Sequence, residues 1–208
     1  MTRSAVVFRV VLFGLLLMPV SAVVLVWIGR ERIAATRSGL PLLGRVQEFA
    51  LTESNGKPAG LTQLRGRVWV AGFVFTHCAG TCPIITHNMK LLQQALPVRD
   101  DLKLVSISVD PARDTPAVLA EYAEKNGADR AHWWFLTGTR ADVYRLTRDV
   151  FKLAVDDANG TEEEPILHSA KLVLVDRSGQ IRGYYDGTDV ATLKKVAKDV
   201  GLLMAQRS

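Results

Sequence analysis

A buried strand that leads directly into a turn with two cysteines most constrains how this chain can fold. Residues 68–75 (Val-Trp-Val-Ala-Gly-Phe-Val-Phe) form a nearly continuous apolar run, which is typical of a strand covered on both faces. Cys78 and Cys82 follow, and Pro83 suits the first turn of a helix whose apolar positions recur at helical spacing. The order predicts an α/β unit with both cysteines where the strand gives way to the helix.

Strands and helices alternate through the rest of the chain, which implies a mainly parallel sheet covered by helices. The predicted strands are residues 46–51, 68–75, 102–109, 133–136, 171–176 and 180–185, and the predicted helices are residues 61–64, 83–96, 115–126, 140–150 and 189–204. A hairpin turn is expected at Asn55-Gly56. A final hairpin followed by a helix is the thioredoxin-like order, so the sequence predicts a thioredoxin-like α/β domain over residues 46–208.

An uncharged apolar segment precedes that domain. Residues 10–28 contain no charged side chain, and a helix needs about 20 apolar residues to cross a bilayer. A cleaved signal peptide with its cleavage site near Ser21 is the alternative. Cleavage there would begin the mature protein with the apolar residues 23–28, which an uncleaved anchor explains better. We therefore predict a membrane anchor at 1–33 and a linker at 34–45.

The charge distribution argues against nucleic-acid binding. The chain has a formal net charge of +5, but +4 of it belongs to the first 40 residues, where five arginines flank the apolar segment. The remainder has no basic groove for phosphates. Arginines on both sides of the segment leave its orientation open. Because no Arg- and Ser-rich presequence precedes it, a bacterial inner membrane is favoured over a mitochondrial one.

The two cysteines allow three interpretations. A structural disulfide would close a very short loop and stabilise the fold little. A redox dithiol usually has the spacing C-x-x-C, whereas this chain has one more residue between Cys78 and Cys82. The third interpretation is a metal site, because two thiolates near a helix N-terminus are soft ligands suited to Cu(I) or zinc.

A metal site needs a third ligand, and the chain has four histidines. His77 is expected to point away from Cys78, His87 to lie on the helix surface, and His132 to be a packing or edge residue. His168 lies in a loop just before a predicted strand, and in thioredoxin-like folds that loop faces the cysteine pair. His168 is therefore the favoured third ligand.

Three motifs together resemble the Sco/SenC family. They are Phe75-Thr76-His77-Cys78-Ala79-Gly80-Thr81-Cys82-Pro83, the segment 105–116 (Val-Ser-Ile-Ser-Val-Asp-Pro-Ala-Arg-Asp-Thr-Pro) with Leu119-Ala120-Glu121-Tyr122, and His168-Ser169 before the strand at 171–176. The resemblance implies a thioredoxin-like domain that binds copper, as Cu(I) or Cu(II), through Cys78, Cys82 and His168. It also implies a domain facing the periplasm, delivery of copper to the binuclear centre in cytochrome c oxidase subunit II, and a thioredoxin-like reductant for the thiols.

The chain departs from the family pattern at two positions. Ala79 stands where proline is frequent, and Leu167 stands where an acidic residue often precedes the histidine. The second change bears on how the imidazole is oriented. A membrane-tethered thiol–disulfide oxidoreductase that uses Cys78 and Cys82, or a peroxide reductase, is the rival function. A structural zinc site would need a fourth ligand, which is not evident.

Two acidic groups of residues are also expected near the site. Asp110 and Asp114 follow the strand at 102–109, and capping of the next helix explains Asp114 at least as well. Glu162, Glu163 and Glu164 precede His168. Docking of a partner or attraction of cations is one interpretation of this acidic run, and a solvated loop is the favoured one.

Overall fold

The computed structural model describes residues 39–156 and 167–206. Contacts divide the chain after Leu40, and Pro41–Ser208 forms a compact unit. The predicted anchor at 1–33 lies outside the described residues. Within the described ranges, no helix is long and apolar enough to cross a membrane.

A mixed eight-stranded sheet forms the centre of the unit, with the order β1-β10-β9-β4-β5-β6-β2-β3 among the described residues. Its strands are β1 (Gly44–Arg45), β2 (Ala50–Glu53), β3 (Pro58–Gly60), β4 (Val68–Val74), β5 (Leu102–Ser108), β6 (Trp133–Thr137), β9 (Lys171–Val175) and β10 (Gln180–Asp186). A second, two-stranded sheet pairs β7 (Val155–Asp156) with β8 (Leu167–His168). Sheet pairing thus begins at Gly44, inside the segment predicted as a linker.

Only the centre of the sheet is parallel. The pairs β4·β5 and β5·β6 are parallel, whereas β9 runs antiparallel to β4 and β10, and β2 runs antiparallel to β3 and β6. The expectation of a mainly parallel sheet is wrong at both flanks. The reason is that hairpins, which need no crossover helix, supply the outer strands.

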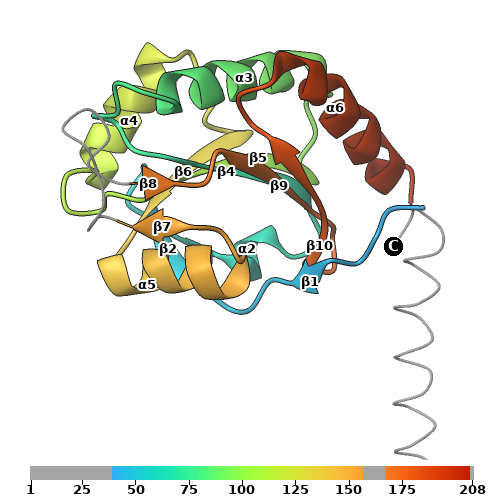
Figure 1. Cartoon of the computed structure of the whole chain (residues 1–208), viewed down its shortest axis with the longest axis horizontal. Coiled ribbons are helices and arrows are strands. Elements are labelled where there is room, and N and C mark those ends of the chain that lie inside the picture. The colour runs from blue at the N-terminus through green and yellow to red at the C-terminus, as the bar shows by residue number, and fades with distance from the viewer. Residues whose placement is uncertain (1–38, 157–166, 207–208) are drawn as a thin grey trace, which may run out of the picture. The chain divides into compact units, whose positions relative to one another are not determined.

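Helices cover both faces of the sheet (Figure 1). On one face lie α3 (Cys82–Ala95), α4 (Pro116–Lys125) and α6 (Val190–Met204). On the other lie α2 (Leu61–Leu64) and α5 (Arg140–Arg145), the latter continued by the π-helical turn η1 (Leu146–Val150). The sheet order β4-β5-β6 advances in one direction, so the right-handed crossovers typical of parallel strands put α3 and α4 on the same face, as Figure 1 shows.

Strand β4 is the core of the fold, since all seven of its residues are buried. Its apolar run was the main sequence signal, and the structure confirms a strand covered on both faces. On the α3 side, a Cβ at Gly72 would lie 3.2 Å from Leu172 and within 4 Å of Ile85 and Met89. On the other side, Phe73 packs edge-on against Phe151, with ring centroids 5.4 Å apart. The glycine therefore lets α3 pack close to the strand end that leads to the cysteines.

The predicted elements are largely confirmed, with one shifted strand and four strands that were not predicted, namely β3 and the two-residue strands β1, β7 and β8. The strand predicted at 46–51 is observed as Ala50–Glu53, because Val46 is instead bound through its amide to the carbonyl of Gly179 at 2.8 Å. The two-residue strands β1, β7 and β8 have too few residues to produce a pattern. The hairpin turn at Asn55-Gly56 is confirmed by the β2·β3 pairing.

Candidate metal centre

The turn between β4 and α3 carries both cysteines. Cys82 is the first residue of α3, with Thr81 as N-cap and Pro83 in the first turn, as predicted. Both cysteines are buried, at 0% exposure for Cys82 and 8% for Cys78. They carry separate thiols. The thiolate is the form in which a cysteine binds a metal, so this turn holds two candidate ligands four residues apart.

A buried carboxylate holds the start of this turn. Asp114 is fully buried. It accepts hydrogen bonds from the Thr76 hydroxyl at 2.6 Å, the Thr76 amide at 3.2 Å and the Ser108 hydroxyl at 2.5 Å. The expectation that Asp114 caps the next helix is wrong. Thr115 is the N-cap of α4 and accepts from the amide of Val118, while the carboxylate of Asp114 is used to fix the backbone two residues before Cys78.

A hydroxyl pair joins α3 to α4 one turn beyond Cys82. The Thr86 hydroxyl lies 2.8 Å from the hydroxyl of Tyr122. Burial raises the pKa of Tyr122, and the nearby Cys82, Cys78 and Asp114 raise it further against the opposing effect of the Thr86 hydrogen bond. The tyrosine therefore stays neutral beside the cysteines and can donate a hydrogen bond.

His168 is placed by its backbone in β8, opposite Val155 of β7. The position of its side chain lies outside the described part of the structure, as do Glu162, Glu163 and Glu164. The predicted loop is thus a short strand at this point. The amide of Ser169 donates to the carbonyl of Ala154 at 3.0 Å, which extends the pairing beyond β8.

Two hydrogen bonds connect the His168 segment to the cysteine helix. The amide of Gly187 donates to the carbonyl of Ala170 at 2.8 Å. The side chain of Asn88, buried in α3, donates to the carbonyl of Gly187, also at 2.8 Å. The segment just after His168 is therefore tied to α3, the helix that begins with Cys82.

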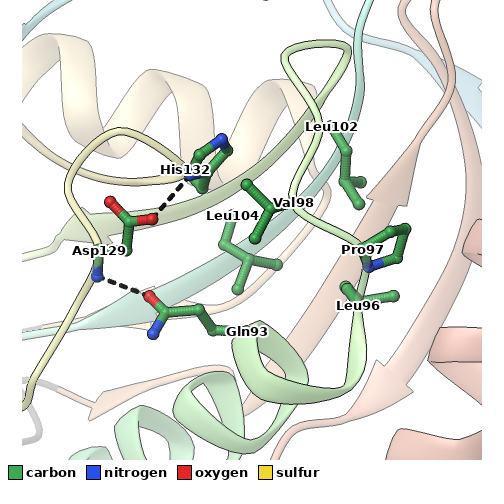
Figure 2. Close-up of a pocket in the computed structure, with 8 residues that line it drawn as sticks. All are labelled: Gln93, Leu96, Pro97, Val98, Leu102, Leu104, Asp129 and His132. Carbon is green, nitrogen blue, oxygen red and sulfur yellow. Dashed lines mark hydrogen bonds and ion pairs between the residues drawn. The ribbon is translucent and has the colours of Figure 1, made fainter.

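The other three histidines behave as the sequence indicated. His87 is exposed on α3. His132 lies just before β6, at the opposite end of the strands from the cysteines, and its Nδ1 is 2.8 Å from Asp129. Figure 2 shows this pair in a mainly apolar pocket. His77 is exposed, and its Nδ1 lies 2.9 Å from the Thr76 hydroxyl.

Among the side chains that the structure describes, which do not include that of His168, no three His, Cys, Asp or Glu groups converge as a metal site. The two thiols therefore form the described part of the candidate centre, and the third ligand remains a prediction for His168.

The expectation that Asp114 lies near the site is confirmed, but sequence reasoning missed the hydrogen bonds through which Asp114 and Tyr122 support the turn. Asp114 and Tyr122 lie far from the cysteines in the chain, and only the packing of α4 against the sheet brings them close. Two weak signals existed. Thr86 is four residues after Cys82 and so shares its helix face, and Ser108 is the polar last residue of a fully buried strand. A buried hydroxyl at a strand end needs a partner.

The fold and the site together define a class of protein. It is a thioredoxin-like domain with a dithiol at its helix N-terminus, as indicated by the sheet order, the hairpin before α6 and the cysteine pair at the start of the first long helix. The SCO1/SenC family model matches residues 43–205. The chain belongs to this family.

Known relatives agree with that assignment. A Bacillus subtilis SCO1 protein homolog is 32% identical over 162 residues, which is 77% of this chain and 83% of the relative. BsSco, described as a cytochrome c oxidase assembly protein with a disulfide switch, is 30% identical, covers 80% of this chain and 97% of its own, and has a TM-score of 0.71. Copper-bound ScoI of Bradyrhizobium japonicum is 25% identical, covers 77% and 99%, and has a TM-score of 0.61.

The chemistry of the donor set fits copper. Two thiols buried at a helix N-terminus are soft donors, which Cu(I) prefers over the harder carboxylate and carbonyl ligands. The carboxylate of Asp114 is hydrogen-bonded to the start of the same turn and so supports the donor set from behind.

Proposed function

We propose that this chain is a membrane-anchored copper chaperone. Cys78 and Cys82 bind one Cu(I) together with His168, and the domain hands the ion to the binuclear copper centre of cytochrome c oxidase subunit II. Membership of the SCO1/SenC family, with both thiols at the start of α3, is the observation that carries this proposal.

Three protein ligands give Cu(I) a trigonal environment that is open on one side. A ligand of a partner can enter there, so the ion passes by exchange without being released into solution. The thiols must be reduced for loading, since a disulfide has no thiolate to offer. A thioredoxin-like thiol reductant is the partner that meets this need.

The connection through Ala170, Gly187 and Asn88 supports His168 as the third ligand. It keeps the backbone just after His168 bound to the helix that carries Cys82. We therefore expect the His168 imidazole to complete the metal site from this segment.

The decisive experiment is an anaerobic Cu(I) titration of the reduced full-length chain against bicinchoninate, with His168→Ala beside it. We expect one tightly held ion per chain and an affinity lower by about 100-fold or more in the variant, since even outer partners of metal ligands are worth about 10–100-fold. His87→Ala is the matched control, because His87 is exposed on α3. Parent-like affinity in His168→Ala would exclude the three-ligand site.

The recipient needs a separate test. The copper-loaded chain should transfer its Cu(I) anaerobically to an apo, reduced subunit II copper domain. One-electron oxidation of the separated domain with ferricyanide should then give the visible absorption of the binuclear centre. If the ion stays on the chain, the proposal that subunit II is the recipient is wrong, whereas the proposed copper site is unaffected.

The proposed location is the bacterial inner membrane, with the domain in the periplasm and residues 10–28 as the span. Alkaline phosphatase fused after residue 208 should be active, and carbonate extraction should leave the chain in the membrane pellet. An inactive fusion or extraction into the supernatant would contradict this arrangement.

A membrane-tethered thiol–disulfide oxidoreductase is the second candidate, and two separate thiols four residues apart favour it. Insulin reduction that is lost in Cys78→Ser but kept in His168→Ala would support this activity. Equal loss in both variants would argue against it.

A further inference from the structure

Strands β7 and β8 carry His168 outside the main sheet. They form a two-stranded sheet of their own, in which Val155 lies opposite His168. On the β8 side, the backbone is tied to α3 through Ala170 and Gly187. Whatever fixes β7 therefore fixes the backbone of His168 from the other side.

The chain reaches β7 through a turn that is wider than an α-helical one. In η1 the amide of Phe151 donates to the carbonyl of Leu146 at 3.0 Å, a π-type hydrogen bond. Lys152 then has a φ of 55°, in the left-handed region that side chains rarely adopt. This conformation turns the chain back, and the amide of Leu153 donates to the carbonyl of Thr147 at 2.9 Å. Strand β7 therefore begins close to the side chains of η1.

One carbonyl of β7 is left without a partner by the strand pairing. The amide of Ser169 donates to the carbonyl of Ala154 at 3.0 Å, on the side of β7 that faces β8. Because hydrogen-bonded and non-hydrogen-bonded pairs alternate along an antiparallel ladder, the next carbonyl, that of Val155, points away from β8. Val155 is only 2% exposed, and a buried carbonyl needs a donor.

Arg148 of η1 supplies that donor. Its Nε and Nη2 atoms both donate to the carbonyl oxygen of Val155, at 2.9 and 2.6 Å. Its guanidinium also lies over the ring of Tyr144, 5.2 Å from the centroid, which is within the range of a cation–π contact. Although Arg148 is an exposed residue, its side chain is thus held at both its edge and its face.

We infer that Arg148 is a positioning residue for the copper ligand His168. Two donors on one rigid plane fix the direction of the Val155 carbonyl better than a single donor on a flexible stem does. The fixed strand then holds the backbone of His168 across the ladder. This role rests on the proposed function, in which His168 is the third ligand, and Arg148 itself does not touch the metal.

The first test is an anaerobic Cu(I) competition with bicinchoninate on the reduced full-length Arg148→Met variant. Methionine keeps an unbranched stem but has no donor, so we expect an affinity about tenfold lower, the scale typical of groups that orient metal ligands. Arg148→Lys keeps the charge on a flexible stem and should lie between this variant and the parent. Arg145→Met is the matched control, because the Arg145 side chain is 41% exposed and pairs only loosely with Asp142, at 4.0 Å. It should bind Cu(I) as the parent does.

A double-mutant cycle separates the positioning of His168 from any other effect on the copper site. If Arg148 acts through His168, adding Arg148→Met to His168→Ala should lower the affinity no further, because the group that it orients is gone. Additive losses would mean that Arg148 acts by another route, and they would overturn the inference.

Amide hydrogen exchange of the metal-free chain tests the same role without copper. The amide of Ser169, which is bonded to β7, should exchange faster in Arg148→Met and at the parent rate in Arg145→Met. The amides of β5 should exchange at the parent rate in both variants, which shows that the core is intact. Should they show that Arg148→Met is unfolded, the same comparisons are made with Arg148→Lys.

Two kinds of failure are distinguishable. Parent-like Cu(I) affinity in Arg148→Met, or parent-like exchange of the Ser169 amide in that variant, would overturn the inference and leave the proposed function in place. Parent-like affinity in His168→Ala would overturn the three-ligand site, and the role of Arg148 with it.

Discussion

At the scale of single residues, buried polar groups determine how the cysteine turn is held. The carboxylate of Asp114 has three donors and no exposure to solvent. Such a group is stable only while its partners remain in place, because an uncompensated buried charge or donor is costly. The turn therefore depends on a residue that does not touch the metal.

Asp114→Asn should lower the free energy of unfolding by about 2–4 kcal/mol, since an amide nitrogen would then face a hydrogen-bond donor inside the protein. Urea denaturation of the reduced chain measures this change. Asp189→Asn is the control. Asp189 is the exposed N-cap of α6, and asparagine caps a helix about as well as aspartate does. Equal stability of the two variants would contradict the role assigned to Asp114.

Tyr185 and Asp199 form a second buried polar pair, with the hydroxyl donating to the carboxylate at 2.8 Å. Burial raises the pKa of Tyr185 above its ordinary value, and the hydrogen bond and charge of Asp199 raise it further. Because the folded pKa lies above the unfolded one, the stabilisation is complete below about pH 10 and is lost as the pH rises beyond it.

Tyr185→Phe should therefore be less stable than the parent at pH 8, by about 1–3 kcal/mol, because Asp199 loses its donor. This difference in the free energy of unfolding should become smaller between pH 10 and 11, because the parent begins to lose there the stabilisation that the neutral Tyr185 hydroxyl gives. Urea titrations at successive pH values measure it. A difference that stays constant to pH 11 would show that Tyr185 does not titrate as described.

At the scale of elements, the glycine after β10 links the His168 segment to α3. A Cβ at Gly187 would lie 2.5 Å from the carbonyl oxygen of Ala170 and 3.3 Å from Leu172. The first contact is with backbone, which cannot move aside without shifting Ser169 and Ala170. Close approach of two backbone segments here requires glycine.

Gly187→Ala should weaken Cu(I) binding by about tenfold, as expected for a change that misorients a ligand, and by less than His168→Ala does. Competition with bicinchoninate measures this affinity. Gly201→Ala in α6 is the control, because a Cβ there meets nothing within 4 Å. Parent-like affinity in Gly187→Ala would mean that this connection does not position His168.

At the scale of the whole molecule, copper binding and folding should be coupled. The proposed ligands come from the β4–α3 turn and from β8, so the proposed site can form only in the folded state. A ligand that binds only the folded chain adds about 4 kcal/mol at a free concentration 1,000 times its Kd.

Cu(I) should therefore raise the Tm of the reduced chain by about 10 °C, since 1 kcal/mol corresponds to roughly 2–4 °C at this size. Anaerobic calorimetry measures the shift. The Cys82→Ser variant keeps a residue of similar size at the start of α3 but lacks one soft donor, so Cu(I) should hardly change its Tm. An equal Tm shift in the parent and in Cys82→Ser would mean that Cu(I) binds at a site that does not include Cys82.

Much of the fold could be predicted from the sequence because the patterns that indicate each strand or helix lie within that element. The apolar run of β4, the position of Pro83 and the helical spacing of Ile85 and Met89 each act within one element. They determined the strand, the helix and the cysteine pair at their junction. The antiparallel flanks and the short strands β7 and β8 depend on pairing between distant segments, which no local pattern encodes.

The sequence by itself determined where the thiols stand and which histidine is the candidate third ligand. Only the tertiary structure decided what supports them. The contacts of Asp114 with Thr76, of Tyr122 with Thr86 and of Asn88 with Gly187 join residues 36 to 99 positions apart. Their partners are set by how the helices pack on the sheet, because a hydrogen bond between distant residues forms only after the hydrophobic core has placed them together.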